Sequence, residues 1–224
     1  MATGPRTYGQ LCGLASALDL LGERWTLLII RELLRGPKRF GELLQGLGGM
    51  GTNLLSSRLK SLEAAGVIER VTLPEPAEAP GYGLTARGSS LQPILEDLSL
   101  WGLEQMERNL AGPEVRAAWA AVTMRTYMDR NGGGAPEGTF AFRVCDERFW
   151  LHITADGSEI LDGSPPEPPI ATATFPDIKD FLLLAAGDRT LDGTDVVVEG
   201  DSRALASLFE VFRIPPPVSG TGLN

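Results

Sequence analysis

Residues 52–65, TNLLSSRLKSLEAA, combine an apolar stripe with a polar face whose side chains could bind nucleic acid. Leucines at 55, 59 and 62 recur at i, i+4 and i+7, which predicts a helix with one buried face. The polar face carries short hydroxyls, an amide and two cations, namely Asn53, Ser56, Ser57 and Lys60, with Arg58 and Ser61 at its flanks. Hydroxyls bind phosphates, an amide pairs with adenine, and cations pair with guanine. The segment predicts a DNA-contacting helix, but a solvated amphipathic helix would show the same pattern.

The elements on either side of this helix indicate how it would be held against DNA. Thr52 is the expected N-cap and Gly66 the expected end of the helix. A short helix, RFGELLQGLGG, is predicted before it, and the strand VIERVTL follows it and returns as YGL at 82–84. A helix, a turn, a second helix and a hairpin make up winged helix-turn-helix geometry. In that geometry the second helix enters the major groove and the hairpin, or wing, meets the DNA backbone.

Two helices are predicted before this unit and a long helical segment after it. Apolar residues at helical spacing predict helices over 11–20 and 23–35, which Gly22 separates. After the wing, residues 85–110 keep a helical pattern that Pro93 either kinks or divides into two helices.

The charge is distributed unevenly between two predicted domains. The segment NLAGPEV contains a glycine and a proline that end the helical pattern, so residues 1–110 and 111–224 are predicted to be separate domains. The net charge of −9 is not typical of a nucleic-acid binder, but residues 111–224, with 17 acidic and 9 basic side chains, hold most of it. Residues 31–60 carry 6 basic and 2 acidic side chains, which predicts a local positive patch.

The predicted wing departs from what contact with DNA favours. Its tip, LPEPAEAPGYG, has two glutamates and neither lysine nor arginine, and anions beside phosphates weaken binding. Phosphate contacts are therefore expected from Lys38 and Arg39 before the short helix, from Arg70 near the base of the wing, and from Arg87. The expected DNA-binding residues are Lys38, Arg39, Thr52, Asn53, Ser56, Ser57, Arg58, Lys60 and Arg70.

Three segments of the first domain resemble a known family: CGLASALDLLGERWTLLIIRELLRGPKRFGELL, GTNLLSSRLKSLEAAGVIER and YGLTARGSSLQPILEDLSLWG. Over about residues 8–108, their order and spacing resemble those of the HxlR-type winged-helix transcriptional regulators of bacteria. The resemblance implies a homodimer, built from the N-terminal helix and the long helix near 89–108, that binds a near-palindromic operator. It places the recognition helix on residues 52–65 and the wing on residues 67–84, and we expect a repressor.

Cys12 lies where some regulators of this type carry a cysteine that senses oxidants or electrophiles, so the resemblance makes it a redox candidate. Its neighbours are Leu11 and Gly13, and no cation is near in sequence to lower the pKa of the thiol. A small, buried apolar residue in a dimer helix is therefore the favoured interpretation.

The second domain mixes helices with strands. Helices are predicted over 113–130, 176–187 and 201–214. Strands are predicted over TFAFRVC, RFWLHITA, SEILDG, IATATF and DVVVEG. The resulting order, α-β-β-β-β-α-β-α, predicts an α+β domain with a sheet of about five strands. The whole chain is thus expected to be an α+β protein, with a winged helix-turn-helix domain followed by this second domain.

Residues 113–214 resemble sterol carrier protein 2-like domains in this order of elements and in the closing segment VVVEGDSRALASLFEVF. The resemblance implies an apolar tunnel between the sheet and its helices, and so a hydrophobic small molecule as effector. The side chains expected to line it are Trp119, Met124, Phe140, Phe142, Phe149, Leu151, Phe181, Leu184, Phe209 and Phe212. Aromatic and methionine side chains suit a long apolar ligand, but they suit an ordinary protein core equally well.

No constellation in the sequence indicates catalysis. Nucleotide-binding glycine motifs and the G-x-S-x-G turn are absent. One histidine, His152, and two cysteines, Cys12 and Cys145, are too few for a zinc cluster or a disulfide framework, so no metal or cofactor is expected. The apolar runs are shorter than the ~20 residues of a membrane helix, and no signal peptide is apparent. We therefore expect a cytoplasmic protein without membrane insertion.

Taken as a whole, the sequence predicts a homodimeric, DNA-binding transcriptional regulator rather than an enzyme. The alternative is a winged-helix protein whose second domain is a lipid carrier or a protein-interaction module without effector sensing.

Overall fold

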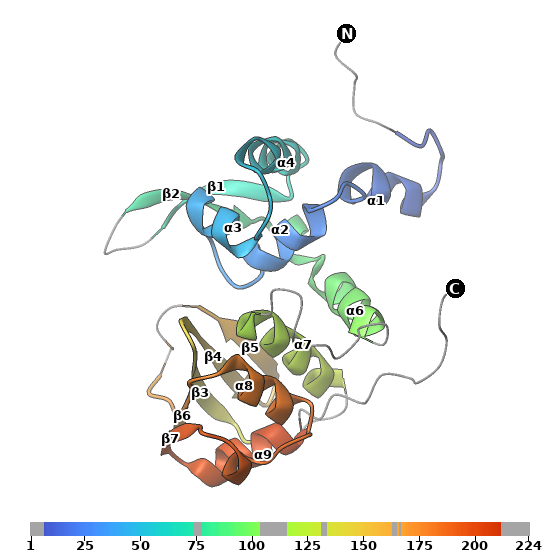
Figure 1. The fold of residues 1–224 in the computed structure, drawn as a ribbon. Coiled ribbons are helices and arrows are strands. Elements are labelled where there is room, and N and C mark those ends of the chain that lie inside the picture. Colours follow the sequence, from blue (N-terminus) through green and yellow to red (C-terminus); the bar gives the residue numbers. More distant parts are fainter. Residues whose placement is uncertain are drawn as a thin grey trace. The chain divides into compact units, whose positions relative to one another are not determined.

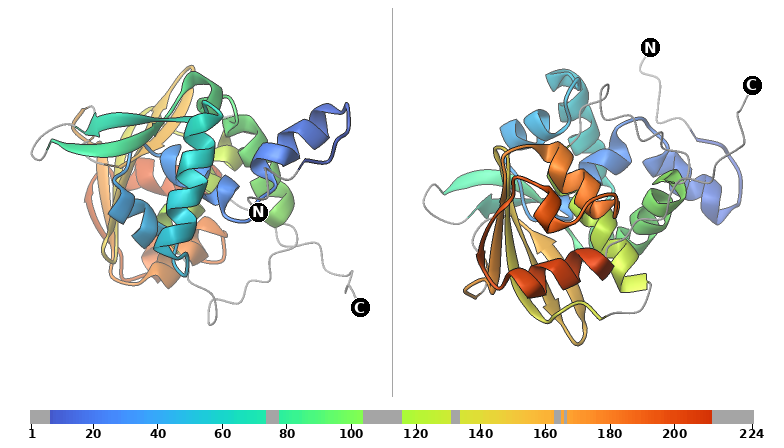
Figure 2. Two further views of the ribbon diagram at one scale, coloured as in Figure 1. Left: turned by 90° about the horizontal axis from the view of Figure 1, so that it is seen from above. Right: turned by 60° about the horizontal axis from the view of Figure 1, so that its bottom comes forward.

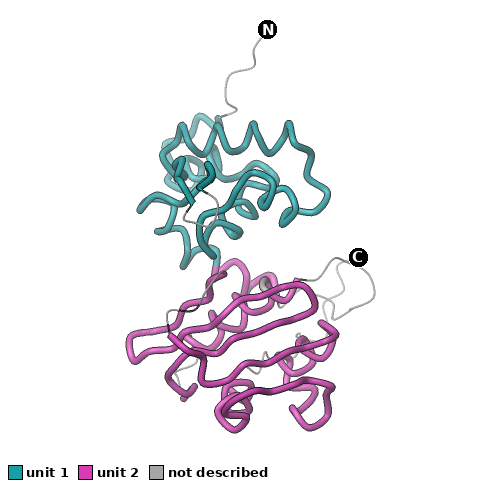
Figure 3. The backbone as a smooth tube through the Cα atoms, turned by 90° about the vertical axis from the view of Figure 1, so that its left-hand side faces the viewer, with its two compact units in different colours: residues 1–95 teal, residues 96–224 magenta. Residues whose placement is uncertain are grey.

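The computed structural model describes residues 7–73, 78–103, 116–130, 134–162, 165 and 167–211. The chain divides into two compact units, residues 1–95 and residues 96–224 (Figure 3). The division falls within helix α6, Gln92–Leu103, whereas the boundary predicted near residues 109–115 lies outside the described residues.

The first unit is a helix-turn-helix followed by a two-stranded hairpin (Figure 1). Its elements are α1 (Gly13–Leu21), α2 (Thr26–Leu33), α3 (Phe40–Gly46), α4 (Thr52–Ala64), β1 (Ile68–Leu73), β2 (Ala79–Leu84), α5 (Ala86–Ser89) and the start of α6, up to Leu95. Leu55, Leu59 and Leu62 of α4 are buried, as the leucine spacing predicted. They join a core that contains Ile29, Ile30, Leu33, Leu43, Leu47, Val67, Ile68 and Leu95.

Most element boundaries in this unit follow the sequence signals. Gly22 separates α1 from α2, and Gly66, with φ of +66°, follows the end of α4, as expected. The N-cap of α4 is Gly51 rather than Thr52, because the backbone is still extended at Gly51 and already helical at Thr52. Pro93 is the second residue of α6, where its missing N–H has no helical partner to lose, so the predicted long helix is divided into α5 and α6.

The wing is anchored to the rest of the first unit by an isolated β-bridge. β1 and β2 pair in antiparallel fashion, with Arg70 opposite Tyr82. Lys38 adds an isolated bridge to Tyr82: each residue donates its N–H to the carbonyl of the other, over 2.9 and 2.8 Å. The segment that precedes α3 is therefore tied to the base of the wing. The wing tip, residues 74–77, lies outside the described residues.

The end of α4 is joined to the start of α5 by a compact polar contact. The Thr85 hydroxyl donates to the Gly66 carbonyl over 2.7 Å and accepts from the Gly88 N–H over 3.1 Å. Gly88 packs so closely that a Cβ at this position would lie 2.1 Å from the Val67 carbonyl oxygen. A side chain of any size would push α5 away from the start of the wing.

The second unit is an α+β domain with three helices on one face of a five-stranded sheet (Figure 2). Its elements are α7 (Ala117–Arg130), β3 (Gly138–Val144), β4 (Glu147–Thr154), β5 (Gly157–Leu161), β6 (Ala171–Phe175), α8 (Ile178–Ala185), a short 3-10 helix (Leu191–Gly193), β7 (Val197–Gly200) and α9 (Ser202–Val211). The strand order is β5-β4-β3-β6-β7, with β3 and β6 parallel and the other pairs antiparallel. The predicted order of elements is confirmed.

Phenylalanine rings fill the core of the second unit. The rings of Phe142, Phe149, Phe175, Phe181 and Phe209 contact one another with centroid separations of 5.2–6.3 Å, mostly edge to face. Each of these residues is at most 5% exposed. The centre of the second unit is therefore packed as a solid core. Among the described residues, no helix is both long enough and apolar enough to span a membrane.

Gly88→Ala is expected to lower the free energy of unfolding of the first unit by roughly 1–3 kcal/mol, because the added methyl group forces the backbone of α5 away from Val67. Gly41→Ala, in α3, is the matched control, since a Cβ there meets nothing within 4 Å. That control should be neutral or slightly stabilising. The two variants are compared by urea denaturation. Equal midpoints would contradict the close packing at Gly88.

Candidate nucleic-acid interface

The outer face of α4 presents polar side chains to solvent. Thr52, Asn53, Ser57 and Lys60 are exposed, and Ser56 is partly exposed. Within the described part of the chain, the Lys60 ammonium has neither a hydrogen-bond nor an ion-pair partner. The three leucines on the buried side hold this face outward, so the predicted reading face is available to a ligand. A hydroxyl, an amide and a cation side by side suit phosphates and base edges.

Arg58 lies at the flank of the polar face of α4, as expected, and has an acidic partner there that the sequence did not indicate. Its guanidinium turns to the side of α4 and donates from Nη2 to the Glu23 carboxylate over 2.6 Å, with the Arg58 side chain 19% exposed. The reason is local: Glu23, just before α2, offers a partner of opposite charge that helical spacing could not reveal. In this structure Arg58 thus joins α4 to the segment just before α2.

Lys38 and Arg39 hold the segment before α3. Arg39 is the N-cap of α3, and its backbone N–H donates to the Glu42 carboxylate over 2.6 Å. Lys38 is fixed by its backbone bridge to Tyr82. Both side chains are partly exposed, next to the base of the wing, where phosphate contacts were expected.

Two arginines brace the junction between α4 and the wing. The Arg70 guanidinium lies 4.5 Å from the centre of the Tyr82 ring and donates to Glu63 over 3.3 Å, with its side chain 57% exposed. Arg87 donates to the Ala65 carbonyl over 2.8 Å, at the C-terminal end of α4. An arginine at that position also complements the negative end of the helix dipole. This capping role of Arg87 was not anticipated from the sequence.

Two helices leave apolar stripes uncovered in the described chain. Leu14 and Leu18 of α1 are exposed, and so is Leu11, two residues before the helix begins. On α6, Ile94, Leu98 and Trp101 recur at i, i+4 and i+7 and are 57%, 47% and 62% exposed. Residues 104–108, the rest of the long helix expected near 89–108, lie outside the described residues. Apolar stripes of this kind mark surfaces that bind another protein surface.

Cys12 is exposed, in contrast to the buried position that the sequence favoured. It is the N-cap of α1, and the backbone N–H groups of Ala15 and Leu14 lower the pKa of its thiol below the usual value. The lowering comes from the first turn of the helix, not from a cation, which is why the sequence neighbours gave no sign of it.

Eight of the ten residues expected to line an apolar tunnel lie together in the packed core of the second unit. Met124, Phe140, Phe142, Phe149, Leu151, Phe181, Leu184 and Phe209 are all buried in the core of the second unit. Trp119 is partly exposed, with the Arg116 guanidinium 5.8 Å from the centre of its ring, and Phe212 lies outside the described residues. The contacts between the rings favour the core interpretation of these side chains, which the sequence had left open.

The helix-turn-helix, the hairpin wing and the outward polar face of α4 together define a winged-helix DNA-binding fold. A family model of the HxlR-like helix-turn-helix matches residues 20–110. The HTH-type transcriptional regulator sll1512 of Synechocystis is 39% identical over 100 residues, which are 45% of this chain and 74% of that protein. YvaP of Bacillus subtilis, also an HTH-type transcriptional regulator, is 41% identical over 91 residues, 41% of this chain and 84% of that protein. The solved structure of reduced YodB from B. subtilis is 35% identical in sequence. The match covers 46% of this chain and 100% of the YodB chain, with a TM-score of 0.38.

The chain therefore belongs to the HxlR-like family of helix-turn-helix transcriptional regulators. The family match ends at residue 110, so the five-stranded domain lies beyond it.

Alkylation of Cys12 by iodoacetamide is expected to show a pH midpoint below the value of about 8.5 of an ordinary thiol, because the lowered pKa leaves more thiolate near neutral pH. The rate is measured by mass spectrometry on a Cys145→Ser background, so that one thiol reports. In 8 M urea the helix N-terminus is lost, and the midpoint should rise to the ordinary value. The same midpoint in folded and unfolded protein would contradict the assignment.

Proposed function

We propose that this chain is a transcriptional repressor that binds a near-palindromic operator as a homodimer. The observation that carries the proposal is the outward face of α4, where Asn53, Ser57 and Lys60 are exposed in a winged helix-turn-helix. The second helix of such a unit fits the major groove, and two-fold symmetry of the protein requires an inverted repeat in the DNA. A dimer seated on both half-sites blocks access to the DNA that it covers.

The uncovered stripes of α1 and α6 support the homodimer. Each stripe presents large apolar side chains to water, and burying them against a second copy would stabilise the assembly by about 25 cal/mol for each Å² removed from solvent. A two-fold interface uses the same surface of both copies, so one chain can supply everything that the contact needs.

The second unit is proposed to be a sterol-carrier-like effector domain. Its order of helices and strands supports this assignment. The packed phenylalanine rings weigh against a wide apolar tunnel in the core, so an effector would have to bind elsewhere in the unit or open the core. A lipid carrier or a protein-interaction module remains the alternative function of this unit.

The experiment that tests the proposed function is selection of genomic DNA fragments by the purified protein, followed by titration of the enriched site at two salt concentrations. An enriched inverted repeat with strongly salt-dependent affinity is expected, because contacts to phosphates release counterions. Enrichment of no sequence, in the presence and absence of an effector, would overturn the proposal.

Lys60→Ala is expected to reduce the slope of log K against log salt by about one for each protomer, because it removes one phosphate contact on each half-site. Lys179→Ala is the matched control: Lys179 is also an exposed helical lysine, but it lies in α8 of the second unit. Both variants are titrated with the selected operator by fluorescence anisotropy. Identical slopes for the two variants would show that Lys60 makes no phosphate contact in the complex.

Leu98→Glu is expected to convert the dimer to monomer, raising the dimer dissociation constant about a hundredfold or more, because two buried unpaired carboxylates would face the interface. Leu98 is exposed in the single chain, so its folding should be unaffected. Ser99→Glu, an exposed neighbour in α6, adds the same charge away from the apolar stripe and should leave the dimer intact. Analytical ultracentrifugation distinguishes these outcomes. A dimer that survives Leu98→Glu would place the interface elsewhere.

A further inference from the structure

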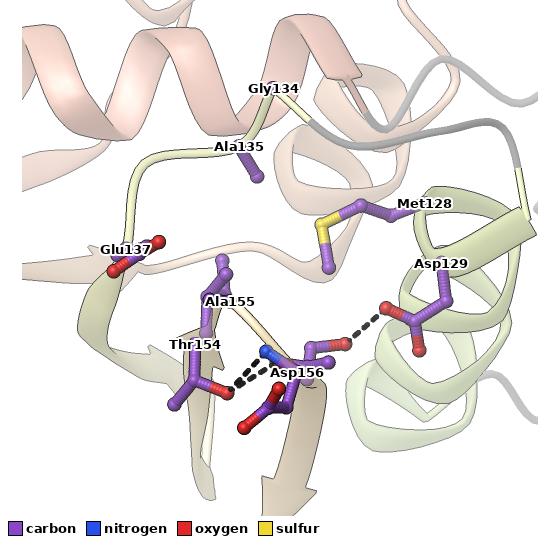
Figure 4. Close-up of a pocket in the computed structure, with 11 residues that line it drawn as sticks. Met128, Asp129, Gly134, Ala135, Glu137, Thr154, Ala155 and Asp156 are labelled. Atoms are coloured by element: carbon purple, nitrogen blue, oxygen red, sulfur yellow. Dashed lines mark hydrogen bonds between the residues drawn. The ribbon is translucent and has the colours of Figure 1, made fainter.

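A pocket of about 500 Å³ opens between the end of α7, the segment before β3 and the β4–β5 hairpin. It is separate from the packed rings of the core. Its floor includes Met128 and Ile153, which are 3% and 6% exposed. Figure 4 shows the Met128 thioether reaching into the space between α7 and the hairpin. A volume of this size is typical of pockets that bind small molecules.

The rim of this pocket is acidic. Asp129, Glu137 and Asp156 line it, and none of the described lining residues is Lys, Arg or His. Glu137 and Asp156 are exposed, and the described part of the chain supplies neither carboxylate with a cationic partner. An apolar floor below two carboxylates without a counter-cation is complementary to a molecule that has an apolar body and a positive charge.

The pocket is connected to helix α6 through one buried arginine. Asp129 accepts a hydrogen bond from the Ser158 hydroxyl over 2.6 Å, and its other oxygen lies 3.6 Å from Nη1 of Arg125. Arg125, whose side chain is 10% exposed, also donates to the Ser158 carbonyl over 3.1 Å and forms a close ion pair with Glu96 of α6. One of the groups that tie α6 to α7 is thus also a neighbour of the pocket.

We propose that this pocket binds a hydrophobic organic cation as the effector of the regulator, and that Arg125 transmits its binding to α6. The inference rests on the proposed function, since it names the ligand class and the site of effector binding. A cation beside Asp129 competes with Arg125 for the same carboxylate. Because little water reaches the Arg125 guanidinium, the loss of Asp129 leaves Glu96 as its remaining carboxylate partner among the described residues and strengthens that ion pair. The ligand thereby favours a state in which α6 is more firmly tied to α7, by the difference in its affinity for the two states.

Calorimetry of the full-length protein with tetraphenylphosphonium tests the site. Tetraphenylborate, which has the same shape and the opposite charge, is the ligand control. Tetraphenylphosphonium should bind, and tetraphenylborate should not. The double variant Glu137→Gln/Asp156→Asn should bind tetraphenylphosphonium about tenfold or more weakly. The reason is that removing one carboxylate within a few ångströms of a cation raises the dissociation constant several-fold, even when the carboxylate is well hydrated.

Glu159→Gln is the matched control, because Glu159 is an exposed acid of β5 that does not line the pocket. It should bind as tightly as the unsubstituted protein. Circular dichroism checks that each variant is folded, and Asp156→Asn alone, with a several-fold loss, replaces the double variant if that one is not. Equal binding of the two probe ions, no binding of the cation, or no loss in the folded rim variants would overturn the site.

Hydrogen exchange tests the link to α6. Tetraphenylphosphonium should slow exchange of the amides of residues 96–103, and unchanged or faster exchange at saturating probe would overturn the role of Arg125. Neither measurement requires DNA. A failure of operator selection would therefore leave a positive calorimetric result standing, and an empty pocket would leave operator binding untouched.

Discussion

The burial of three leucines on one side of α4 is the constraint on which the rest of the DNA-binding surface depends. Leu55, Leu59 and Leu62 are at most 1% exposed, and burying each side chain is worth about 1.5–3 kcal/mol. Rotating the helix by one residue would expose part of this stripe and draw Lys60 toward the core, where an unpaired ammonium is costly. The outward direction of Asn53, Ser57 and Lys60 is therefore a consequence of packing on the opposite side.

The cationic side chains around α4 differ in the interactions within the protein that each would give up to bind a DNA phosphate. Arg70 is more than half exposed, and an exposed ion pair such as the one with Glu63 contributes about 0–1 kcal/mol, so exchanging Glu63 for a phosphate costs little. Arg58 is much less exposed and holds Glu23, so leaving that partner would cost more. Lys60 has no such partner to give up among the described residues. The structure thus ranks these three side chains by the cost of releasing their present partners, although the sequence presents them as equivalent.

How much could be predicted from the sequence depends on the range of the interactions involved. The leucine period of α4, the break at Gly22 and the succession of helices and strands along the second unit are local signals, and all three are confirmed. The partner of Arg58 is 35 residues away, and the carbonyl capped by Arg87 is 22 residues away, so neither follows from spacing. Composition alone could not distinguish a tunnel from a core, because the same phenylalanines serve both. The pocket at the end of α7 is built from three separate segments and left no motif in the sequence.

Helix α6 makes two kinds of contact and leaves one apolar stripe exposed. Leu95 belongs to the core of the first unit, Glu96 and Asp97 form ion pairs with Arg125 and Arg130 of α7, and the stripe of Ile94, Leu98 and Trp101 is uncovered. A helix moves largely as one body, because its backbone hydrogen bonds link each residue to the one four positions on. A change in the strength of the ion pair between Arg125 of α7 and Glu96 would therefore also shift the apolar stripe of α6. If the apolar stripe joins two copies, its position sets the distance between their two α4 helices. A ligand that binds more tightly at one of these distances than at another changes the affinity for DNA, by the difference in its binding free energy between the two states.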